Sequence, residues 1–183
     1  MRHAPLAVLI SLAIVPACTT GGASPSDRSS SVGSDGANAL ATVRDASGRS
    51  LGTLEVSQTT DGVMVAGTLR GLAPGVHGIH IHGVGRCDAP AFTTAGGHWN
   101  PTAHMHGFEN PMGPHMGDLR NIVVGSDSVV VIRGVSTGGS LRGASGVLDA
   151  DGAAIVVHAG PDDYHTDPAG NSGARVACGV IMP

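Results

Sequence analysis

The sequence predicts an all-β domain of about eight short antiparallel strands, folded as a sandwich or a barrel. Three observations point to this class. The apolar residues are mostly Val, Ala, Leu and Ile, and Gly contributes 29 of the 183 residues. From residue 38 onward, short apolar segments alternate with turn signals. No segment has the periodicity of a convincing amphipathic helix.

Each expected strand rests on a local pattern. Residues 39–43 and 51–56 are strand-like, and the Asp61-Gly62 pair that follows is a hairpin turn signal. It leads into residues 63–69, where every second position is apolar or Gly, so these side chains share one face. Residues 79–82 continue the alternation. The later strands are expected at residues 121–125, 128–133, 152–157 and 175–181.

Composition excludes two classes of protein. Charged residues make up 13% of the chain, its formal net charge is -4, and all ten basic residues are Arg. The aromatic residues are one Trp, one Tyr and two Phe. A nucleic-acid-binding protein would present a basic surface with stacking aromatics, so no nucleic-acid partner is expected. With 41% hydrophobic residues, disorder throughout the chain is not expected either.

The N-terminal region is expected to direct export. Residues 1–18 have a positive start at Arg2 and an apolar run at 6–15, which is shorter than the roughly 20 residues that span a bilayer. The leader ends in residues 15–18, a Val-Pro-Ala-Cys sequence that resembles a bacterial lipoprotein box, so Cys18 is a candidate lipidation site. A plain signal peptide is the alternative. Residues 19–37, rich in Gly and Ser, are expected to be a flexible linker, and residues 38–183 the folded domain.

One stretch breaks the strand pattern. Residues 83–118 form a loop of about 36 residues, and a loop of this length is expected only where it has a function. Something other than an apolar core must hold it, and the sequence offers Cys87 and a group of His residues.

The His residues predict a metal site. His80 and His82 lie two apart on an expected strand and therefore share one face. Imidazole suits zinc, copper, iron and nickel; an all-nitrogen ligand set suits Cu(II), and three His with one Asp suit Zn(II). Spacing alone does not divide the ligands between two ions. The candidates are His80, His82, His98, His104, His106, His115, Asp118 and His158.

Six segments then stand in a fixed order along residues 38–183: 78–82 (GIHIH), 96–101 (GGHWNP), 106–107 (HG), 115–119 (HMGDL), 156–158 (VVH) with 162–163 (DD), and 173–181 (GARVACGVI). In sequence and order they resemble the copper/zinc superoxide dismutases. The resemblance implies an eight-stranded, flattened Greek-key barrel with long metal-binding loops. It also implies an enzyme that converts superoxide to oxygen and hydrogen peroxide by alternating Cu(II) and Cu(I), and that protects the cell envelope.

The resemblance implies a ligand set, carried over residue by residue. His98 would bridge the two ions as an imidazolate, which two flanking cations make possible, and would take up a proton in catalysis. Asp162 corresponds to the carboxylate that links a copper ligand to a zinc ligand. Copper would be held by His80, His82, His98 and His158, and zinc by His98, His106, His115 and Asp118.

The remaining His residues are expected to take no part. His104, two residues before His106, could compete for the zinc position. His77 and His165 are expected to be exposed, and His3 leaves with the leader.

Arg175 corresponds to the Arg that stands beside copper and attracts superoxide, since a guanidinium stays charged and donates several hydrogen bonds. Relatives often carry Lys on the loop before the last strand, but residues 159–174 contain no basic residue. Arg86 and Arg120 are therefore candidates for additional guidance. With Cys18 set aside, Cys87 and Cys178 are an even pair in an exported chain, and a disulfide is expected.

Three alternatives stay open. A non-catalytic copper-binding lipoprotein would favour Met or Cys for Cu(I), and Met105, Met112 and Met116 lie near the His residues. A copper-only relative would lack the zinc ligands, and a bare adhesive sandwich would leave the His residues unexplained. We expect an exported, periplasmic, lipid-anchored superoxide dismutase with copper and zinc as cofactors, as a monomer or a homodimer.

Overall fold

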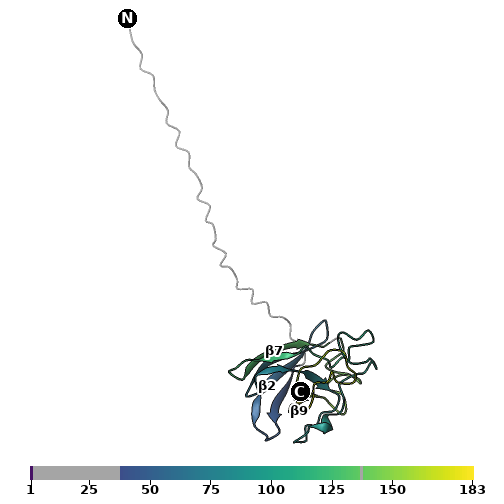
Figure 1. The fold of residues 1–183 in the computed structure, drawn as a ribbon. Coiled ribbons are helices and arrows are strands. Elements are labelled where there is room, and N and C mark those ends of the chain that lie inside the picture. Colours follow the sequence, from purple (N-terminus) through teal and green to yellow (C-terminus); the bar gives the residue numbers. More distant parts are fainter. Residues whose placement is uncertain (2–37, 137) are drawn as a thin grey trace. The chain divides into compact units, whose positions relative to one another are not determined.

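The computed structural model describes Met1 and residues 38–183 except residue 137. These residues form nine β-strands and one 3-10 turn, η1 (Thr93–Ala95), with no α-helix among them (Figure 1). No helix in the described part is long and apolar enough to cross a membrane. The export signal and the linker lie outside the described residues. The strands are β1 (Ala39–Asp45), β2 (Ser50–Gln58), β3 (Val63–Arg70), β4 (Gly75–His77), β5 (Ile79–His82), β6 (Ile122–Val124), β7 (Val129–Val135), β8 (Ala154–His158) and β9 (Arg175–Met182).

Seven strands form one antiparallel sheet in the order β5-β8-β9-β1-β2-β3-β7, and β4 pairs with β6 beside it. The sheet curls, so the all-β prediction of a flattened barrel is confirmed (Figure 1). Strands far apart in sequence are neighbours: β3 pairs with β7, and β5 with β8. The long connections that these pairings require carry the loops described below.

The alternation of buried and exposed residues along the strands shows which face of the sheet packs against the apolar core. In β1 the buried residues Ala39, Ala41 and Val43 alternate with exposed ones. By contrast, β5 and β8 are buried at every position. Ile79 and Ile81 of β5 belong to the apolar core, so the two His residues of that strand face the opposite side, where other chain segments cover them.

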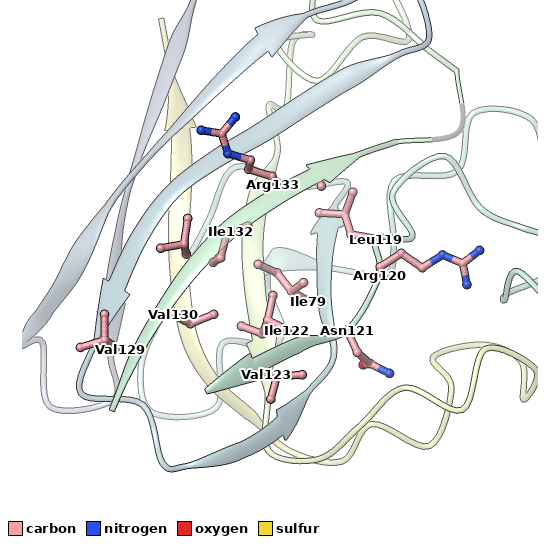
Figure 2. A pocket seen from close by; sticks show the side chains of 12 residues that line it. Ile79, Leu119, Arg120, Asn121, Ile122, Val123, Val129, Val130, Ile132 and Arg133 are labelled. Atoms are coloured by element: carbon pink, nitrogen blue, oxygen red, sulfur yellow. The ribbon is translucent and has the colours of Figure 1, made fainter. Parts of the chain in front are cut away.

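The strand count differs from the expected eight because the region before residue 79 forms a strand of its own. β4 pairs with β6, whereas β5 pairs with β8, and Gly78 lies between them with its N–H bonded to the Gly160 carbonyl at 2.8 Å. A cavity of about 330 Å³ lies between β6 and β7, and it is lined by apolar side chains of both strands together with Arg120, Asn121 and Arg133 (Figure 2).

The expectation that His77 is exposed was wrong. Its side chain is only 4% exposed. The ring lies between two main-chain oxygens, with Nδ1 2.7 Å from the His158 carbonyl and Nε2 2.8 Å from the Ala73 carbonyl. These hydrogen bonds offset the cost of burying a polar ring, which the sequence pattern does not reveal.

Candidate metal centre

The outer edge of β5 organises the long loop. β5 is the last strand of the sheet, and both limbs of the loop bond to it through Ile81, whose N–H donates to the Gly117 carbonyl and whose carbonyl accepts from the Trp99 N–H, each at 2.8 Å. A Cβ at Gly117 would overlap the Ile81 carbonyl, so this close approach requires glycine. The loop residues His98 and Asp118 thereby lie beside the two histidines of β5.

Four His residues converge on one point, and we call them the four-histidine cluster: His80, His82, His98 and His158. Their candidate ligand atoms all lie within 4.8 Å of one another. In each ring one buried nitrogen has no hydrogen-bond partner among the described residues. These atoms are His80 Nδ1, His82 Nε2, His98 Nε2 and His158 Nε2.

The other ring nitrogen of each member faces an oxygen acceptor. The acceptors are Asp162 Oδ2 for His80 (2.8 Å), the Gly96 carbonyl for His82 (2.9 Å), Asp118 Oδ1 for His98 (2.7 Å) and the Gly173 carbonyl for His158 (3.2 Å). An acceptor holds the ring proton on its own side, which leaves a lone pair on the nitrogen that faces the centre of the cluster.

Burial keeps these rings neutral. It lowers the pKa of His98 and of His158 to about 4, and it lowers the pKa of His80 and, further, of His82. Neutral imidazole is the form that binds a metal. Four inward lone pairs without partners fit a cation such as copper, for which nitrogen ligands are suitable.

A second group, the three-histidine-aspartate cluster, shares one member with the first and consists of His98, His106, His115 and Asp118. The Nδ1 atoms of the three rings lie 2.7, 3.1 and 3.3 Å from Asp118 Oδ1. Asp118 Oδ2 is used differently, because it accepts the N–H groups of Gly107 (2.9 Å) and His115 (3.0 Å). Three imidazoles and one carboxylate oxygen fit the tetrahedral preference of zinc.

Charge distinguishes the second cluster from the first. Burial acts to lower the pKa of His106, but hydrogen bonds to Asp118 and Asp162 outweigh this effect and raise the pKa to about 9. Burial acts to raise the pKa of Asp118, but hydrogen bonds from His106, His115 and His98 hold it well below its usual range. The carboxylate is therefore ionised and can balance the charge of a divalent ion.

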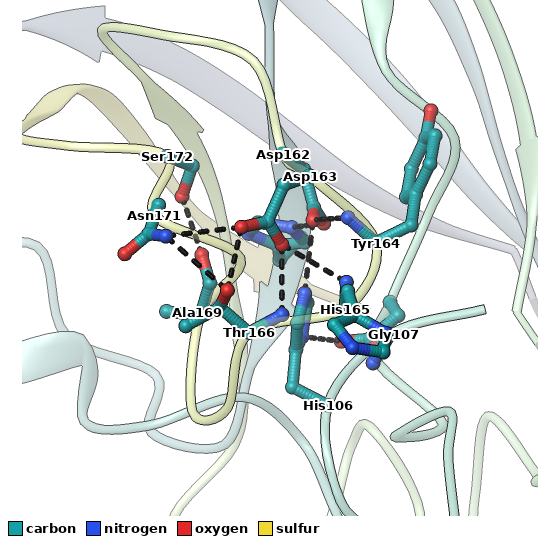
Figure 3. A network of polar contacts seen from close by, with 12 residues as sticks. His106, Gly107, Asp162, Asp163, Tyr164, His165, Thr166, Ala169, Asn171 and Ser172 are labelled. Carbon is teal, nitrogen blue, oxygen red and sulfur yellow. Dashed lines mark hydrogen bonds and ion pairs between the residues drawn. The ribbon is translucent and has the colours of Figure 1, made fainter. Parts of the chain in front are cut away.

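Asp162 connects the clusters. Its Oδ2 lies 2.8 Å from His80 Nε2 and its Oδ1 lies 3.0 Å from His106 Nε2, and the carboxylate is buried (Figure 3). Hydrogen bonds from the two rings outweigh burial and hold the pKa of Asp162 below its usual range. Asp162 thus orients one ring in each cluster.

Arg175 begins β9 and lies opposite His158 at an irregularity in the β8–β9 ladder. Its Nη1 donates to the Phe92 carbonyl at 2.7 Å and its Nη2 to the Gly96 carbonyl at 2.6 Å. The Gly96 carbonyl therefore orients both Arg175 and a ring of the four-histidine cluster. A cavity of about 420 Å³ opens beside Arg175, and Arg175 is the one charged residue among those that line it.

The disulfide between Cys87 and Cys178 is confirmed, with Cα atoms 5.7 Å apart across 91 residues of sequence. Cys178 lies in the middle of β9, paired with β8 and β1. The bond pins the long loop to the strand that begins with Arg175.

The other sequence candidates lie elsewhere. His104 belongs to neither cluster; it is exposed, and its Nδ1 lies 3.1 Å from the Pro114 carbonyl. His165 is exposed, as expected. The exposed side chain of Arg86 pairs with Asp88 at 2.6 Å. Cys18 and His3 lie outside the described residues.

Apart from Asp162, sequence reasoning missed the groups that orient the ligands. Most are main-chain atoms, such as the Gly96 and Gly173 carbonyls, and no residue type signals them. Asn121 is a side-chain example: its amide exchanges two hydrogen bonds with the main chain of Asp162, at 2.8 and 2.9 Å. Tyr164 is another, and the only available signal was that it is one of four aromatic residues in the chain.

This chain is similar to known proteins over most of its length. Residues 50–181 match the family model described as copper/zinc superoxide dismutase (SODC). The chain is 44% identical over 148 residues to the Cu-Zn superoxide dismutase of Caulobacter vibrioides, covering 79% of this chain and 85% of the relative. It is 40% identical over 137 residues to Cu-Zn superoxide dismutase 1 of Aquifex aeolicus, covering 73% and 81%. The crystal structure of a SOD-like protein from Bacillus subtilis aligns with a TM-score of 0.74 at 37% identity, covering 78% of this chain and 97% of that one.

Proposed function

The chain belongs to the copper/zinc superoxide dismutase family, and we propose that the four-histidine cluster holds its copper and the three-histidine-aspartate cluster its zinc. The protein is an oxidoreductase that converts superoxide to oxygen and hydrogen peroxide, with copper and zinc as cofactors. His98 belongs to both clusters and is the proposed bridge between the ions.

One observation carries this assignment. Four buried ring nitrogens face one point without partners in the described part of the chain, while the opposite nitrogen of each ring has an oxygen acceptor. Leaving four polar atoms unsatisfied would be costly unless a ligand completes them. The geometry supports a resident cation at this point.

When bound, copper supplies the one-electron oxidation and reduction of superoxide, whereas zinc has no redox chemistry and fixes the shape and basicity of the site. Arg175 is the proposed anion-binding residue. Its guanidinium, anchored by two carbonyls, keeps its remaining N–H groups for superoxide at the adjacent cavity.

The reaction consumes two superoxide anions and two protons and yields one oxygen and one hydrogen peroxide. Protons must therefore reach the reduced product at the site. Nε2 of His98 is one of the four atoms that would hold copper, and it is the proposed atom that carries a proton to the product whenever it would not be bound to the metal. Its Nδ1, 2.7 Å from Asp118 Oδ1, is the atom that would bind zinc, and zinc would then keep the ring from turning away.

The assignment is tested by metal content and by dismutation, measured on protein loaded with copper and zinc. We expect about one copper and one zinc per chain. His158→Ala should lose copper and activity but retain zinc, and His115→Ala should lose zinc. His165→Ala, an exposed histidine outside both clusters, is the matched control. Wild-type activity in His158→Ala would overturn the assignment.

We also propose that the protein is exported and anchored through a lipid on Cys18, where it protects the cell envelope from superoxide. The disulfide supports an oxidising compartment. The test is fractionation of cells that express the protein after labelling with a radioactive fatty acid. The wild type should carry label and sediment with membranes, and Cys18→Ser should not. An unlabelled, soluble wild type would leave the plain signal peptide as the explanation.

A further inference from the structure

Two of the chain's four aromatic residues meet around one arginine. The Arg120 guanidinium carbon lies 4.1 Å from the centre of the Phe108 ring and 5.2 Å from that of the Tyr164 ring. The two rings are themselves 5.7 Å apart, edge to face. The Arg120 side chain points away from the apolar side chains between β6 and β7 (Figure 2). We call Phe108, Arg120 and Tyr164 the aromatic clasp.

The clasp joins three segments that are remote in sequence. Phe108 follows the zinc-cluster residue His106 by two residues, Arg120 follows Asp118 by two, and Tyr164 follows Asp162 by two. The contacts therefore hold the Asp162 loop against two of the ligand-bearing segments of the proposed zinc site, those that contain His106 and Asp118.

Tyr164 also reaches Asp162 directly. Its main-chain N–H donates to Asp162 Oδ1 at 2.6 Å, the oxygen that also faces His106 (Figure 3). Its hydroxyl accepts the Asn121 N–H at 2.7 Å, and its carbonyl accepts the Glu109 N–H at 2.9 Å. Tyr164 has a φ of +61°, a conformation that costs free energy for any residue other than glycine, so the surrounding contacts must hold it there.

Asn121 completes the attachment. Its side chain bonds both to the N–H and to the carbonyl of Asp162, while its own N–H is bonded to the Tyr164 hydroxyl. Movement of the Tyr164 ring would therefore disturb Asp162 from two directions, through the Tyr164 main chain and through Asn121.

We propose that Tyr164 is a positioning residue for Asp162, and that Arg120 and Phe108 hold it in place. The clasp keeps the Asp162 carboxylate on the His106 ring and so slows the loss of zinc. Arg120 thus serves to position the site; the expectation that it helps guide superoxide is a separate prediction, which these contacts do not test. The inference rests on the proposed roles of Asp162 and His106.

The test measures the rate at which zinc leaves the copper- and zinc-loaded protein in the presence of an excess of a chromogenic chelator. Loss of a group that orients a metal ligand typically lowers metal affinity by 10- to 100-fold, so Tyr164→Leu should release zinc about tenfold faster. Arg120→Gln should release it about threefold faster, and Arg120→Lys, which keeps a cation over the rings, should restore slow release. Arg142→Gln, an exposed arginine outside the clasp, is the matched control.

A spectroscopic measurement separates positioning from general stability. Cobalt(II) in the zinc site reports ligand geometry through its visible spectrum, which should change in Tyr164→Leu and not in Arg142→Gln. The double variant Tyr164→Leu/Arg120→Gln should release zinc no faster than Tyr164→Leu, because both changes break the same contact. Additive effects, or a lowered unfolding temperature with unchanged zinc release and cobalt spectrum, would overturn the proposal.

Asp162→Asn distinguishes this failure from a failure of the proposed function. If Asp162→Asn speeds zinc release and Tyr164→Leu does not, only the clasp proposal falls. If Asp162→Asn itself leaves zinc release and the cobalt spectrum unchanged, the proposed linking role of Asp162 falls, and the clasp proposal falls with it.

Discussion

Gly170 packs directly against the carboxylate that links the two clusters. Its φ is +61°, and a Cβ added there would overlap Asp162 Oδ1 and lie 2.7 Å from His106 Nε2. Gly170→Ala therefore changes no chemical group of the site and yet forces Asp162, His106 or the loop to move. The substitution tests whether the close packing around Asp162 is required.

The expected cost has two parts. A left-handed backbone costs an alanine about 1 kcal/mol relative to glycine. Extra volume in a packed interior typically costs a further 1–3 kcal/mol, so Gly170→Ala should lower the free energy of unfolding by about 2–4 kcal/mol. Gly48→Ala isolates the first part, because Gly48 has a φ of +85° and no atom lies within 4 Å of its Cβ position. It should cost only about 1 kcal/mol.

Denaturant unfolding of the metal-free variants measures both costs, and zinc titration measures the effect on the site. Gly170→Ala should bind zinc at least about tenfold more weakly than the wild type, since displacing an orienting carboxylate has this effect, whereas Gly48→Ala should bind it normally. Equal destabilisation in the two variants together with unchanged zinc affinity would refute the reasoning.

Three further outcomes are expected. Arg175→Gln should retain both metals but lower the rate of dismutation about tenfold and weaken the dependence of that rate on ionic strength. Pulse radiolysis at several ionic strengths measures the rate, and an unchanged dependence on ionic strength would contradict a guiding role. Replacing Cys87 and Cys178 together by Ser should lower the free energy of unfolding by about 4 kcal/mol, the order of magnitude that the chain-entropy model gives for a 91-residue separation. Denaturant unfolding measures the loss, and an unchanged free energy of unfolding would contradict a stabilising role of the disulfide. Zinc must displace a proton from His106, whose pKa is about 9, so the affinity for zinc should rise as pH increases from 7 to 9 and then level off. Copper should meet no such competition in this range, because the pKa of His158 is about 4. Calorimetry in buffers of different ionisation enthalpy measures both dependences, and a zinc affinity that does not change with pH would contradict the first expectation.

The strands could be predicted because half-exposed strands carry a period of two. Ala39, Ala41 and Val43 in β1 are an example, and the alternating Ile and His residues of β5 predicted that both rings share one face. The pattern did not separate β4 from β5, because Gly78 changes the pairing partner without a change in local composition.

The candidate ligands and the linking carboxylate of Asp162 could be named from residue type and motif order, but the main-chain groups that orient the ligands could not. A carbonyl such as that of Gly96 belongs to every residue type, so its role appears only when the fold brings it to His82 and Arg175. His77 was misplaced for a related reason. Its buried position depends on two main-chain oxygens supplied by residues 4 and 81 positions away.

The two anchors of Arg175 have a consequence for how the loop can evolve. Because the Phe92 and Gly96 carbonyls hold the guanidinium, no side chain of the loop is committed to that task. The contacts to Arg175 therefore place no demand on the type of side chain in this segment, provided that the path of the chain is kept; Ala95 is constrained separately, because it is fully buried. Backbone conformation sets the limit, since Phe92 and Gly96 both have positive φ, at 54° and 73°. Selection at Gly96 should therefore act on backbone tolerance, whereas selection at Phe92 should also act on the side chain, which is buried in an apolar cluster with Ala95 and Cys178.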